Sequence, residues 1–439
     1  MSDIITNTLQ TIGINELNEM QQASLRANES GRDVVLLSPT GSGKTLAFLL
    51  PLLKQMKQGT DTIQAMVIAP SRELALQIEE VFRSFKSDFH ITCCYGGHPF
   101  EVEKNALANH PELVVGTPGR LLDHINQKSF SPETIKFLVL DEFDKSLELG
   151  FQGEMEAVIS QLTGVKKRMM LSATKSEEIP PFTKIHHPMV LDFLGNTETL
   201  RSLKVHLVQS PIKDKLETLL KLVCTIGNQP TLIFCNYRES VERIANFLKK
   251  NKLDCKMFHG GMEQVDREKS LFQFRNGTSY LLVSTDLASR GLDIPEIQNV
   301  VHYHLPINKE SYTHRNGRTA RMYADGNAYI ILHGEEHLPD FLEGEELNPF
   351  ELPEVCDAPQ PSEWASIYIG KGKRDKLSKG DIAGFLMKKG ELGKDDLGRI
   401  EVKEQFSFAT VRRTKINALL QKVRGEKIKG MKTLFEEAK

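Results

Sequence analysis

The sequence predicts an α/β protein with two tandem parallel-sheet domains and a small C-terminal α+β domain. Short, nearly continuous Val/Ile/Leu runs alternate with amphipathic segments in two successive series, a pattern typical of parallel strands covered on both faces. The length of 439 residues suits two or three domains. A Pro-containing acidic stretch then precedes a last segment with a mixed strand and helix pattern.

The strand-like runs set the expected domain boundaries. The first series comprises residues 33–38, 65–70, 113–118, 137–142 and 168–174, and the second comprises 231–236, 280–286, 299–306 and 327–333. The polar residues 194–202 predict a hinge between the series. Residues 366–432 predict the order strand, helix, strand, strand, helix, strand. We therefore expect domains at 1–197, 205–343 and 362–439, with an acidic linker at 344–361.

Charge is unevenly distributed, although the formal net charge is only −2. Residues 334–362 contain nine Asp/Glu and no Lys/Arg, whereas residues 363–439 contain 19 Lys/Arg against 11 Asp/Glu. This asymmetry predicts an acidic connector and a basic appendage that binds a polyanion. Two solvated charged faces are the alternative interpretation.

Other classes of protein are disfavoured by composition. The six cysteines form no CxxC pair and no metal-ligand spacing, which predicts a reducing compartment. The first residues lack the pattern of a signal peptide, and no run approaches the roughly 18 apolar residues of a membrane span. We expect a cytoplasmic monomer that does not associate with membranes.

The stretch SPTGSGKT predicts a phosphate-binding loop, because it follows the strand-like run 33–38 and precedes an apolar helix start. Glycines at 41 and 43 let backbone N–H groups approach phosphates, Lys44 can reach the β/γ oxygens, and Thr45 can hold Mg²⁺. A nucleoside triphosphate is therefore the expected ligand. The loop residues are Ser38, Pro39, Thr40, Gly41, Ser42, Gly43, Lys44 and Thr45.

Three carboxylates in DEFD follow the run FLVL. The carboxyl ends of parallel strands face the ligand crevice, so Asp141 is expected beside the phosphate loop, where it binds Mg²⁺ together with Thr45. Glu142 is expected to orient the attacking water and to accept its proton. Asp144 has two interpretations at this point: a separate coupling contact, or the N-cap of the following helix.

Nine stretches taken in order resemble the motifs of DEAD-box RNA helicases. They are SPTGSGKT (38–45), APSRELA (69–75), YGG (95–97), TPGR (117–120), DEFD (141–144), SAT (172–174), HGGMEQVDR (259–267), STDLASRGLDIP (284–295) and HRNGRTAR (314–321). The resemblance covers residues 13–333. It implies two RecA-like domains that use ATP and Mg²⁺ and act on RNA.

The resemblance also implies individual roles in the nucleotide site. Gln21 would read the adenine edge, with Gln22 as the adjacent alternative, and Asp293 would contact the ribose. Arg315, Arg318 and Arg321 are spaced three apart, which predicts one stripe on a helix. Of these, the resemblance assigns Arg318 and Arg321 as arginine fingers. In the family the last Asp of the tetrad bonds to the Ser of SAT, so Asp144, Ser172 and Thr174 would couple hydrolysis to domain movement.

RNA is the partner that the resemblance implies. The positions that line the family's groove are Ser71, Arg72, Gly97, Thr117, Pro118, Gly119, Arg120, Arg267, Thr285 and Arg290. Hydroxyls, small residues and arginines of this kind contact the sugar-phosphate backbone without reading bases. Bending one strand in such a groove is incompatible with pairing, so local strand separation is expected.

The last segment is similar to the C-terminal RNA-binding domain of the DbpA type, which has an RRM fold and binds structured ribosomal RNA. The residues expected to contact RNA phosphates are Lys371, Lys373, Arg374, Lys376, Lys427 and Lys429. Phe406 and Phe408 share one face of a strand, but the glycine-aromatic signature of base-stacking RRMs is missing. Both burial in a core and stacking on RNA remain open for these rings.

A few positions depart from the family pattern. They are Phe143, Ala320, His302 and His304, together with the absence of an upstream aromatic residue in residues 1–12. The predicted function is an RNA-stimulated, ATP-dependent helicase that separates short duplexes or remodels RNA–protein complexes, in large ribosomal subunit assembly. The alternatives are an RNA clamp that hydrolyses ATP weakly and a DNA-acting relative.

Overall fold

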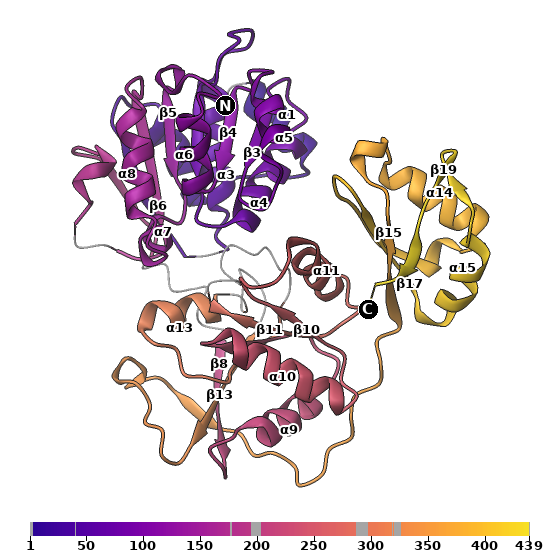
Figure 1. Ribbon diagram of the computed structural model, residues 1–439. Coiled ribbons are helices and arrows are strands. Elements are labelled where there is room, and N and C mark those ends of the chain that lie inside the picture. Colours follow the sequence, from indigo (N-terminus) through magenta and orange to yellow (C-terminus); the bar gives the residue numbers. More distant parts are fainter. Residues whose placement is uncertain are drawn as a thin grey trace. The chain divides into compact units, whose positions relative to one another are not determined.

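The computed structural model describes residues 3–39, 41–175, 178–194, 203–286, 297–317, 319 and 326–438 (Figure 1). The first domain contains a seven-stranded parallel sheet in the order β3-β4-β2-β5-β6-β1-β7. The strands are β1 (Val34–Leu37), β2 (Ala65–Ile68), β3 (Ile91–Cys94), β4 (Leu113–Gly116), β5 (Phe137–Leu140), β6 (Lys167–Ser172) and β7 (Met189–Asp192). Because β5, β6 and β1 are neighbours, the loops that follow them start from the same edge of the sheet.

Both faces of this sheet are buried. Val34 and Leu36 point into one hydrophobic cluster, while Val35 and Leu37 point into another on the opposite face. The covering helices are α1 (Asp3–Thr11), α2 (Glu19–Asn28), α3 (Lys44–Gln55), α4 (Arg72–Ser84), α5 (Phe100–Leu107), α6 (Pro118–Asn126), α7 (Phe143–Glu148) and α8 (Gln152–Gln161). This two-sided burial explains why the strands read as continuous apolar runs.

The second domain repeats this architecture with the strand order β10-β11-β9-β12-β13-β8-β14, again all parallel. Its strands are β8 (Leu203–Ser210), β9 (Thr231–Cys235), β10 (Cys255–Phe258), β11 (Leu281–Thr285), β12 (Asn299–His302), β13 (Gly326–His333) and β14 (Leu347–Pro349). The helices described in it are α9 (Leu216–Ile226), α10 (Arg238–Lys250), α11 (Gln264–Arg275) and α13 (Lys309–Asn316). Clusters on both faces make this sheet a buried layer too.

The acidic segment 344–361 lies along the second domain. Residues 347–349 of this segment form β14, which pairs with β8. Phe350 and Leu352 then pack against the core of the domain, and the Asn228 side-chain amide donates to the Gln360 carbonyl at 2.9 Å. The segment thus follows the surface of the domain up to the start of the third one.

The third domain has a four-stranded antiparallel sheet in the order β16-β17-β15-β20, as the predicted element order required. Its elements are β15 (Trp364–Ile369), α14 (Lys379–Lys389), β16 (Leu397–Val402), β17 (Ser407–Arg412), α15 (Ile416–Val423), the added hairpin β18 (Lys427–Ile428) and β19 (Met431–Lys432), and β20 (Phe435–Glu437). Ile367 and Ala409 face a core that includes residues of both helices. Trp364 begins the first strand, and the Arg412 guanidinium lies 4.3 Å from its ring centroid.

The opposite face of this small sheet packs against α11 of the second domain. The Phe408 ring stacks on Phe272 at 5.0 Å between centroids, and Phe406 is buried in the same cluster. The Asn276 side-chain amide donates to Ser366 Oγ at 3.0 Å and to Thr410 Oγ1 at 2.7 Å. Of the two interpretations left open for Phe406 and Phe408, the structure supports burial, in a cluster that includes Phe272 of α11 and is separate from the core of their own domain.

The sequence located most strands and missed several. The strands β3, β7, β8, β10 and β14 were not predicted, because they are short or interrupted by polar residues. The predicted hinge at 194–202 falls largely outside the described residues, which resume at 203. Among the described helices none is both long and apolar enough to cross a membrane.

Candidate nucleotide and nucleic-acid site

The phosphate loop connects β1 to α3 and is braced by α2. Gly43 caps α3 with φ of 87°, a left-handed conformation that favours glycine. The Gln21 side-chain amide donates to the Gly43 carbonyl at 3.2 Å, while its oxygen accepts from the Asn18 backbone N–H at 3.0 Å. A Cβ on Gly43 would lie 2.6 Å from the Gln21 amide nitrogen, so the close approach also requires glycine.

The two glutamines considered for reading adenine have different surroundings. Gln21 lies against the phosphate loop, whereas the Gln22 amide donates to the Leu17 carbonyl at 2.8 Å. Asn18 adds a second brace, since its amide donates to the Ser42 carbonyl at 3.0 Å. The site therefore includes Asn18, which sequence analysis missed although it is the N-cap in a capping box with Gln21.

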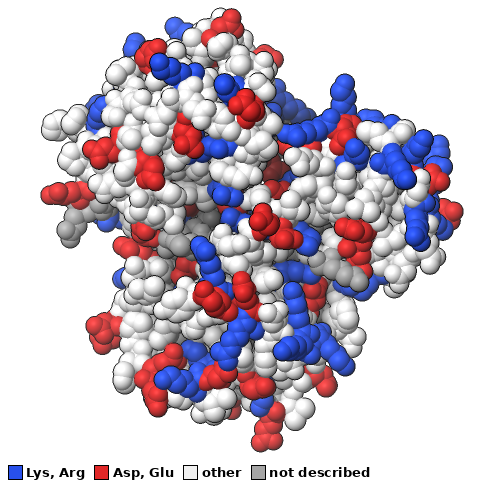
Figure 2. Space-filling view, in the orientation of Figure 1, with Lys and Arg blue, Asp and Glu red and all other residues white. Residues whose placement is uncertain are grey.

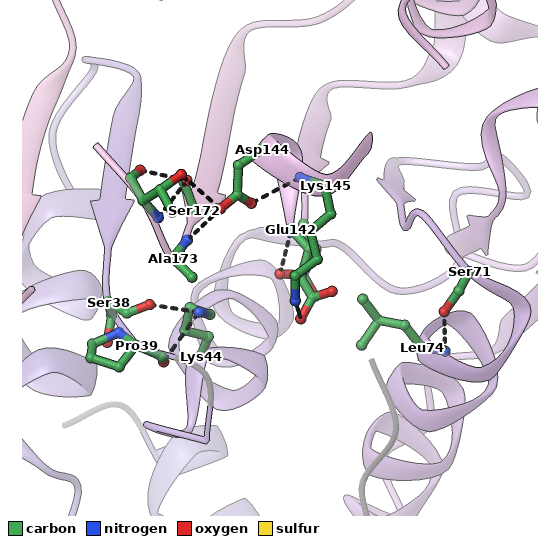
Figure 3. A network of polar contacts seen from close by, with 12 residues as sticks. Ser38, Pro39, Lys44, Ser71, Leu74, Glu142, Asp144, Lys145, Ser172 and Ala173 are labelled. Atoms are coloured by element: carbon green, nitrogen blue, oxygen red, sulfur yellow. Dashed lines mark hydrogen bonds and ion pairs between the residues drawn. The ribbon is translucent and has the colours of Figure 1, made fainter. Parts of the chain in front are cut away.

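Lys44 is folded into its own loop (Figure 3). The ammonium group donates to the carbonyls of Ser38 at 2.6 Å and Pro39 at 3.2 Å, and the side chain is buried. Burial lowers the pKa of Lys44, while the nearby Glu142 and Asp141 oppose that effect. Thr45 is the next residue of α3 and is half-buried, and Thr40 lies outside the described residues.

Asp141 and Glu142 follow β5, at the sheet edge that also carries the phosphate loop. Both side chains are buried, and the Glu142 backbone N–H donates to Asp141 Oδ1 at 2.9 Å. Burial raises the pKa of Asp141 to about 7, and the adjacent Glu142 adds to the rise, while Lys44 opposes it. These interactions are consistent with the prediction that Lys44, Asp141 and Glu142 lie close together.

Glu142 has a backbone conformation that non-glycine residues rarely adopt. Its φ of 44° and ψ of 51° are left-handed, at the N-cap of α7. Such conformations cost about 1–3 kcal/mol and cluster at functional sites. Its carboxylate lies 3.0 Å from Nζ of Lys145, which is fully buried (Figure 3). Lys145 was not predicted as a site residue; α7 buries it together with Phe143 and Ser146.

Asp144 connects DEFD to SAT, but not through Ser172 as predicted. Its Oδ2 accepts from Thr174 Oγ1 at 2.9 Å and from the Ala173 backbone N–H at 3.2 Å. Ser172 Oγ donates instead to the Thr174 carbonyl at 2.6 Å. The N-cap interpretation of Asp144 is also wrong, since Glu142 occupies that position. Asp144 therefore contacts SAT through Ala173 and Thr174 rather than through Ser172.

The predicted RNA residues of the first domain come from three loops that lie together. Ser71 caps α4, its Oγ accepting from the Leu74 backbone N–H at 3.2 Å (Figure 3), and a Cβ on Gly97 would lie 2.6 Å from the Arg72 guanidinium. The Thr117 backbone N–H donates to the Cys94 carbonyl at 3.1 Å. Pro118 and Gly119 begin α6, and Arg120 turns inward to a buried Glu103 at 2.6 Å.

Arg315 is a buried hub of the second domain. Its guanidinium donates to both oxygens of Asp286 at 2.6 and 2.7 Å, to Asn236 Oδ1 at 2.8 Å and to the His304 carbonyl at 2.7 Å. Arg315 lies in the last turn of α13, which ends at Asn316, so the predicted stripe of three arginines continues outside the described residues. Arg318, Arg321, Asp293 and Arg290 lie outside the described residues.

The other predicted RNA residues of this domain are largely buried. Arg267 lies on α11 with its guanidinium 4.8 Å from the Phe258 ring centroid, and Thr285 ends β11. Arg238, which sequence analysis missed, packs beside Gly260 and Gly261. Arg238 follows β9, Arg267 follows β10 and Thr285 ends β11. The second-domain motifs were predicted at these strand ends.

Two histidines replace the usual residues beside Arg315. His302 Nε2 lies 3.0 Å from Asn316 Oδ1, and His304 Nδ1 accepts from the Asn236 backbone N–H at 3.2 Å. Burial, reinforced by the charge of Arg315, lowers the pKa of His302 to about 3. Burial and the charges of Lys215 and Arg315 lower the pKa of His304 to about 4.

Replacing His302 with Asn is expected to flatten the acid sensitivity of the second domain. Below a pH of about 6.5 the unfolded chain protonates His302, whereas the folded chain resists protonation down to about pH 3. Stability therefore falls as pH falls through this window, by up to about 1.4 kcal/mol per pH unit for this residue. Urea unfolding at pH 7 and pH 5 measures it, and equal losses in both proteins would contradict it.

The basic residues predicted to contact RNA in the third domain are mostly exposed. Lys373, Arg374 and Lys376 lie in the loop between β15 and α14, and Lys371 pairs with Asp375 at 2.8 Å. Figure 2 shows Lys and Arg side chains standing on the surface of this domain, at the right of the view. They suit contacts with a phosphate backbone.

Comparisons with known families match all three domains. Residues 18–180 match the DEAD/DEAH box helicase model, residues 214–323 match the helicase conserved C-terminal domain, and residues 366–437 match the DbpA RNA binding domain. Each matched range lies within one of the three domains.

Two bacterial helicases and one yeast structure are similar to this chain, and the two bacterial proteins match it over almost its full length. The ATP-dependent RNA helicase DbpA of Bacillus subtilis (strain 168) is 30% identical over 100% of this chain and 98% of its own length, and that of Escherichia coli (strain K12) is 32% identical over 97% and 95%. The structure of S. cerevisiae Dbp5 bound to RNA and ADP BeF3 has a TM-score of 0.72 at 25% identity, covering 80% of this chain and 94% of that one. The chain therefore belongs to the DEAD-box family of ATP-dependent RNA helicases, in the group that carries a DbpA RNA-binding domain.

Proposed function

We propose that this helicase uses RNA-stimulated ATP hydrolysis to separate short RNA duplexes or remodel RNA–protein complexes during assembly of the large ribosomal subunit. The observation that carries the proposal is that three motifs lie at the same edge of the sheet of the first domain. Lys44 follows β1, Glu142 follows β5, and Asp144 bonds to Thr174 after β6. A change at the triphosphate can thus reach SAT through Asp144.

Mg²⁺ fits the residues at this edge. Asp141 is a buried carboxylate whose pKa is raised by burial and by the adjacent Glu142, and Thr45 adds a hydroxyl one residue after Lys44. Oxygen ligands of this kind are those that Mg²⁺ prefers. Bound with ATP, the ion would neutralise the charge of the phosphate oxygens. We propose Asp141 and Thr45 as the residues that hold it.

The remaining roles are assigned to side chains of this chain. Backbone N–H groups at the start of α3 and the Lys44 ammonium would bind the phosphates, with Gln21 toward the adenine. Glu142 would orient a water molecule and take its proton. We propose Arg318 and Arg321 as arginine fingers and Asp293 as the ribose contact, on the basis of the family resemblance.

RNA would bind along the loops that carry Arg72, Gly97 and Thr117 in the first domain and Arg267 and Thr285 in the second. Their small residues, hydroxyls and guanidinium groups favour backbone contacts, so the core would accept RNA of any sequence. The experiment is phosphate release and duplex separation by the purified protein with matched RNA and DNA. No stimulation at saturating RNA would contradict the proposal, and equal stimulation by DNA would favour a DNA-acting enzyme.

The competing interpretation, an RNA clamp with weak hydrolysis, depended on Phe143 distorting the site. The Phe143 ring is 2% exposed and lies in the core, 6.1 Å from the Phe182 ring centroid. It fills space behind the sheet edge and leaves the phosphate loop free. The other residue invoked, Ala320, lies outside the described residues. We therefore retain hydrolysis as the proposed activity.

Preference for ribosomal RNA is expected to depend on the third domain. In the full-length protein, changing Lys373 and Lys376 to Glu should abolish preferential stimulation by large-subunit ribosomal RNA and leave stimulation by generic RNA unchanged, because both lysines are exposed. The control is Lys213→Glu, an exposed lysine of the second domain. Unchanged preference in the double variant would contradict this assignment.

A further inference from the structure

Glu103 is a buried carboxylate of the first domain that has no role in the nucleotide site. It lies on α5 with its side chain 1% exposed. Its Oε1 accepts from the Tyr95 backbone N–H at 3.1 Å and lies 3.2 Å from His98 Nδ1. Its Oε2 accepts from Arg120 Nε at 2.6 Å and lies 2.8 Å from His124 Nε2. Four groups from two chain segments therefore converge on one carboxylate.

These contacts join two of the loops proposed to bind RNA. Tyr95 and His98 flank the glycine pair of YGG, and Arg120 ends TPGR in the first turn of α6. The Arg120 guanidinium also donates to the His98 carbonyl and lies 5.1 Å from the Phe100 ring centroid. Phe100 in turn stacks on His124 at 4.2 Å. The relative position of the two loops thus depends on this cluster.

The cluster could instead be a metal site, because ligand atoms of Cys94, Glu103 and His124 lie within 4.8 Å of one another. Two observations argue against that. The oxygen nearest His124 already accepts from the Arg120 guanidinium, a permanent cation that would repel a metal ion. Burial also raises the pKa of the Cys94 thiol well above its usual value, so it stays protonated. The arrangement suits a carboxylate held among nitrogen donors.

Arg120 points two of its donors into the protein. Its side chain is 14% exposed, and the guanidinium donates through Nε to Glu103 and through Nη2 to the His98 carbonyl. A phosphate would be left with the remaining N–H groups of this mostly buried side chain. The backbone of the two loops, by contrast, presents glycine and small residues such as Gly97 and Gly119.

We propose that Glu103 is a positioning residue for RNA binding, which holds the loop at 95–98 against the first turn of α6, and that Arg120 shapes the groove from within. The inference rests on the proposed function, because it assumes that these loops bind RNA. An uncharged amide could not replace the carboxylate fully. It offers one acceptor oxygen, and its NH₂ group would face the N–H donors of Arg120 or Tyr95.

The test is steady-state phosphate release by the full-length protein with a single-stranded RNA of mixed sequence. Glu103→Ala is expected to raise the KM for RNA by about 10-fold or more, since misplacement of a binding element is costly. The KM for ATP and the rate at saturating RNA should stay within about twofold of the wild type. Glu103→Gln should give a smaller rise, because one acceptor oxygen remains.

Arg120→Lys separates positioning from direct contact. Lysine keeps a cation for phosphate but cannot span Glu103 and the His98 carbonyl with a rigid fork. Positioning predicts that Arg120→Lys resembles Glu103→Ala, whereas a direct phosphate contact predicts a nearly normal KM for RNA. Arg83→Lys is the control, since Arg83 is an exposed arginine of α4 that pairs with Glu79.

The outcomes are distinguishable. A folded Glu103→Ala protein with a normal KM for RNA overturns the inference, and so does a parallel rise in both KM values with a lower melting temperature. If that variant does not fold, Glu103→Gln is judged by the same criteria. Stoichiometric metal in the purified wild type would assign the cluster to metal binding and also overturn it. A wild type that RNA does not stimulate would refute the proposed function itself.

Discussion

Replacing Glu142 with Gln is expected to reduce RNA-stimulated phosphate release by about 10²–10⁴-fold, the usual contribution of a general base. The side chain keeps its size, but the amide cannot accept a proton from water. The affinity for ATP should remain near normal, because Lys44 and the phosphate loop are unaltered. Phosphate release and nucleotide titration measure the two quantities. Glu156→Gln, an exposed residue of α8, is the control.

The buried partner of Glu142 offers a second check. The change also removes the 3.0 Å ion pair with Lys145, and an unpaired buried charge can cost about 3–5 kcal/mol. The double variant Glu142→Gln with Lys145→Met removes both charges. It is expected to regain stability while phosphate release stays low. Recovery of hydrolysis along with stability would mean that the loss came from the fold and not from the missing base.

Changing Arg315 to Met is expected to destabilise the second domain by about 3–5 kcal/mol, because it leaves Asp286 without its bidentate partner. The guanidinium is 1% exposed and also joins the ends of β9 and β12 through Asn236 and the His304 carbonyl. Urea unfolding and hydrogen exchange at the β12 amides measure the effect.

A matched arginine of the same domain is the control. Arg243 pairs with Asp214 at 2.5 Å, but both side chains are about half exposed. Solvent screens such pairs, so Arg243→Met should cost at most about 1 kcal/mol. Similar decreases in the free energy of unfolding in the two variants would mean that the burial of Arg315 does not increase its contribution to stability.

The two-sheet fold and the nucleotide loop were predictable because both depend on local signals. Continuous apolar runs marked the buried strands, and SPTGSGKT has a spacing that few other structures require. The sequence favoured Gln21 over Gln22, but it could not show what orients the Gln21 side chain. That orientation depends on the capping box with Asn18, which points one of two neighbouring amides at Gly43.

Contacts between distant segments were the least predictable part. The resemblance pointed Asp144 at Ser172, yet its carboxylate accepts hydrogen bonds from Thr174 and Ala173 instead. Of the three arginines expected on one helix, the structure describes only Arg315, whose partners Asp286 and Asn236 lie far away in the sequence. Glu103 carried no signal at all, because its four partners are brought together only by the packing of α5 and α6.

Trp364 gives the packing of the third domain on α11 a practical consequence. It is the single tryptophan of the chain, it begins β15, and its backbone N–H donates to Ser362 Oγ, which itself donates to the Gly277 carbonyl. Indole emission depends on the polarity around the ring, and here an arginine covers that ring at the junction. The unlabelled protein thus carries one intrinsic indole fluorophore at the start of the third domain, two residues after the Ser362 contact with the second domain.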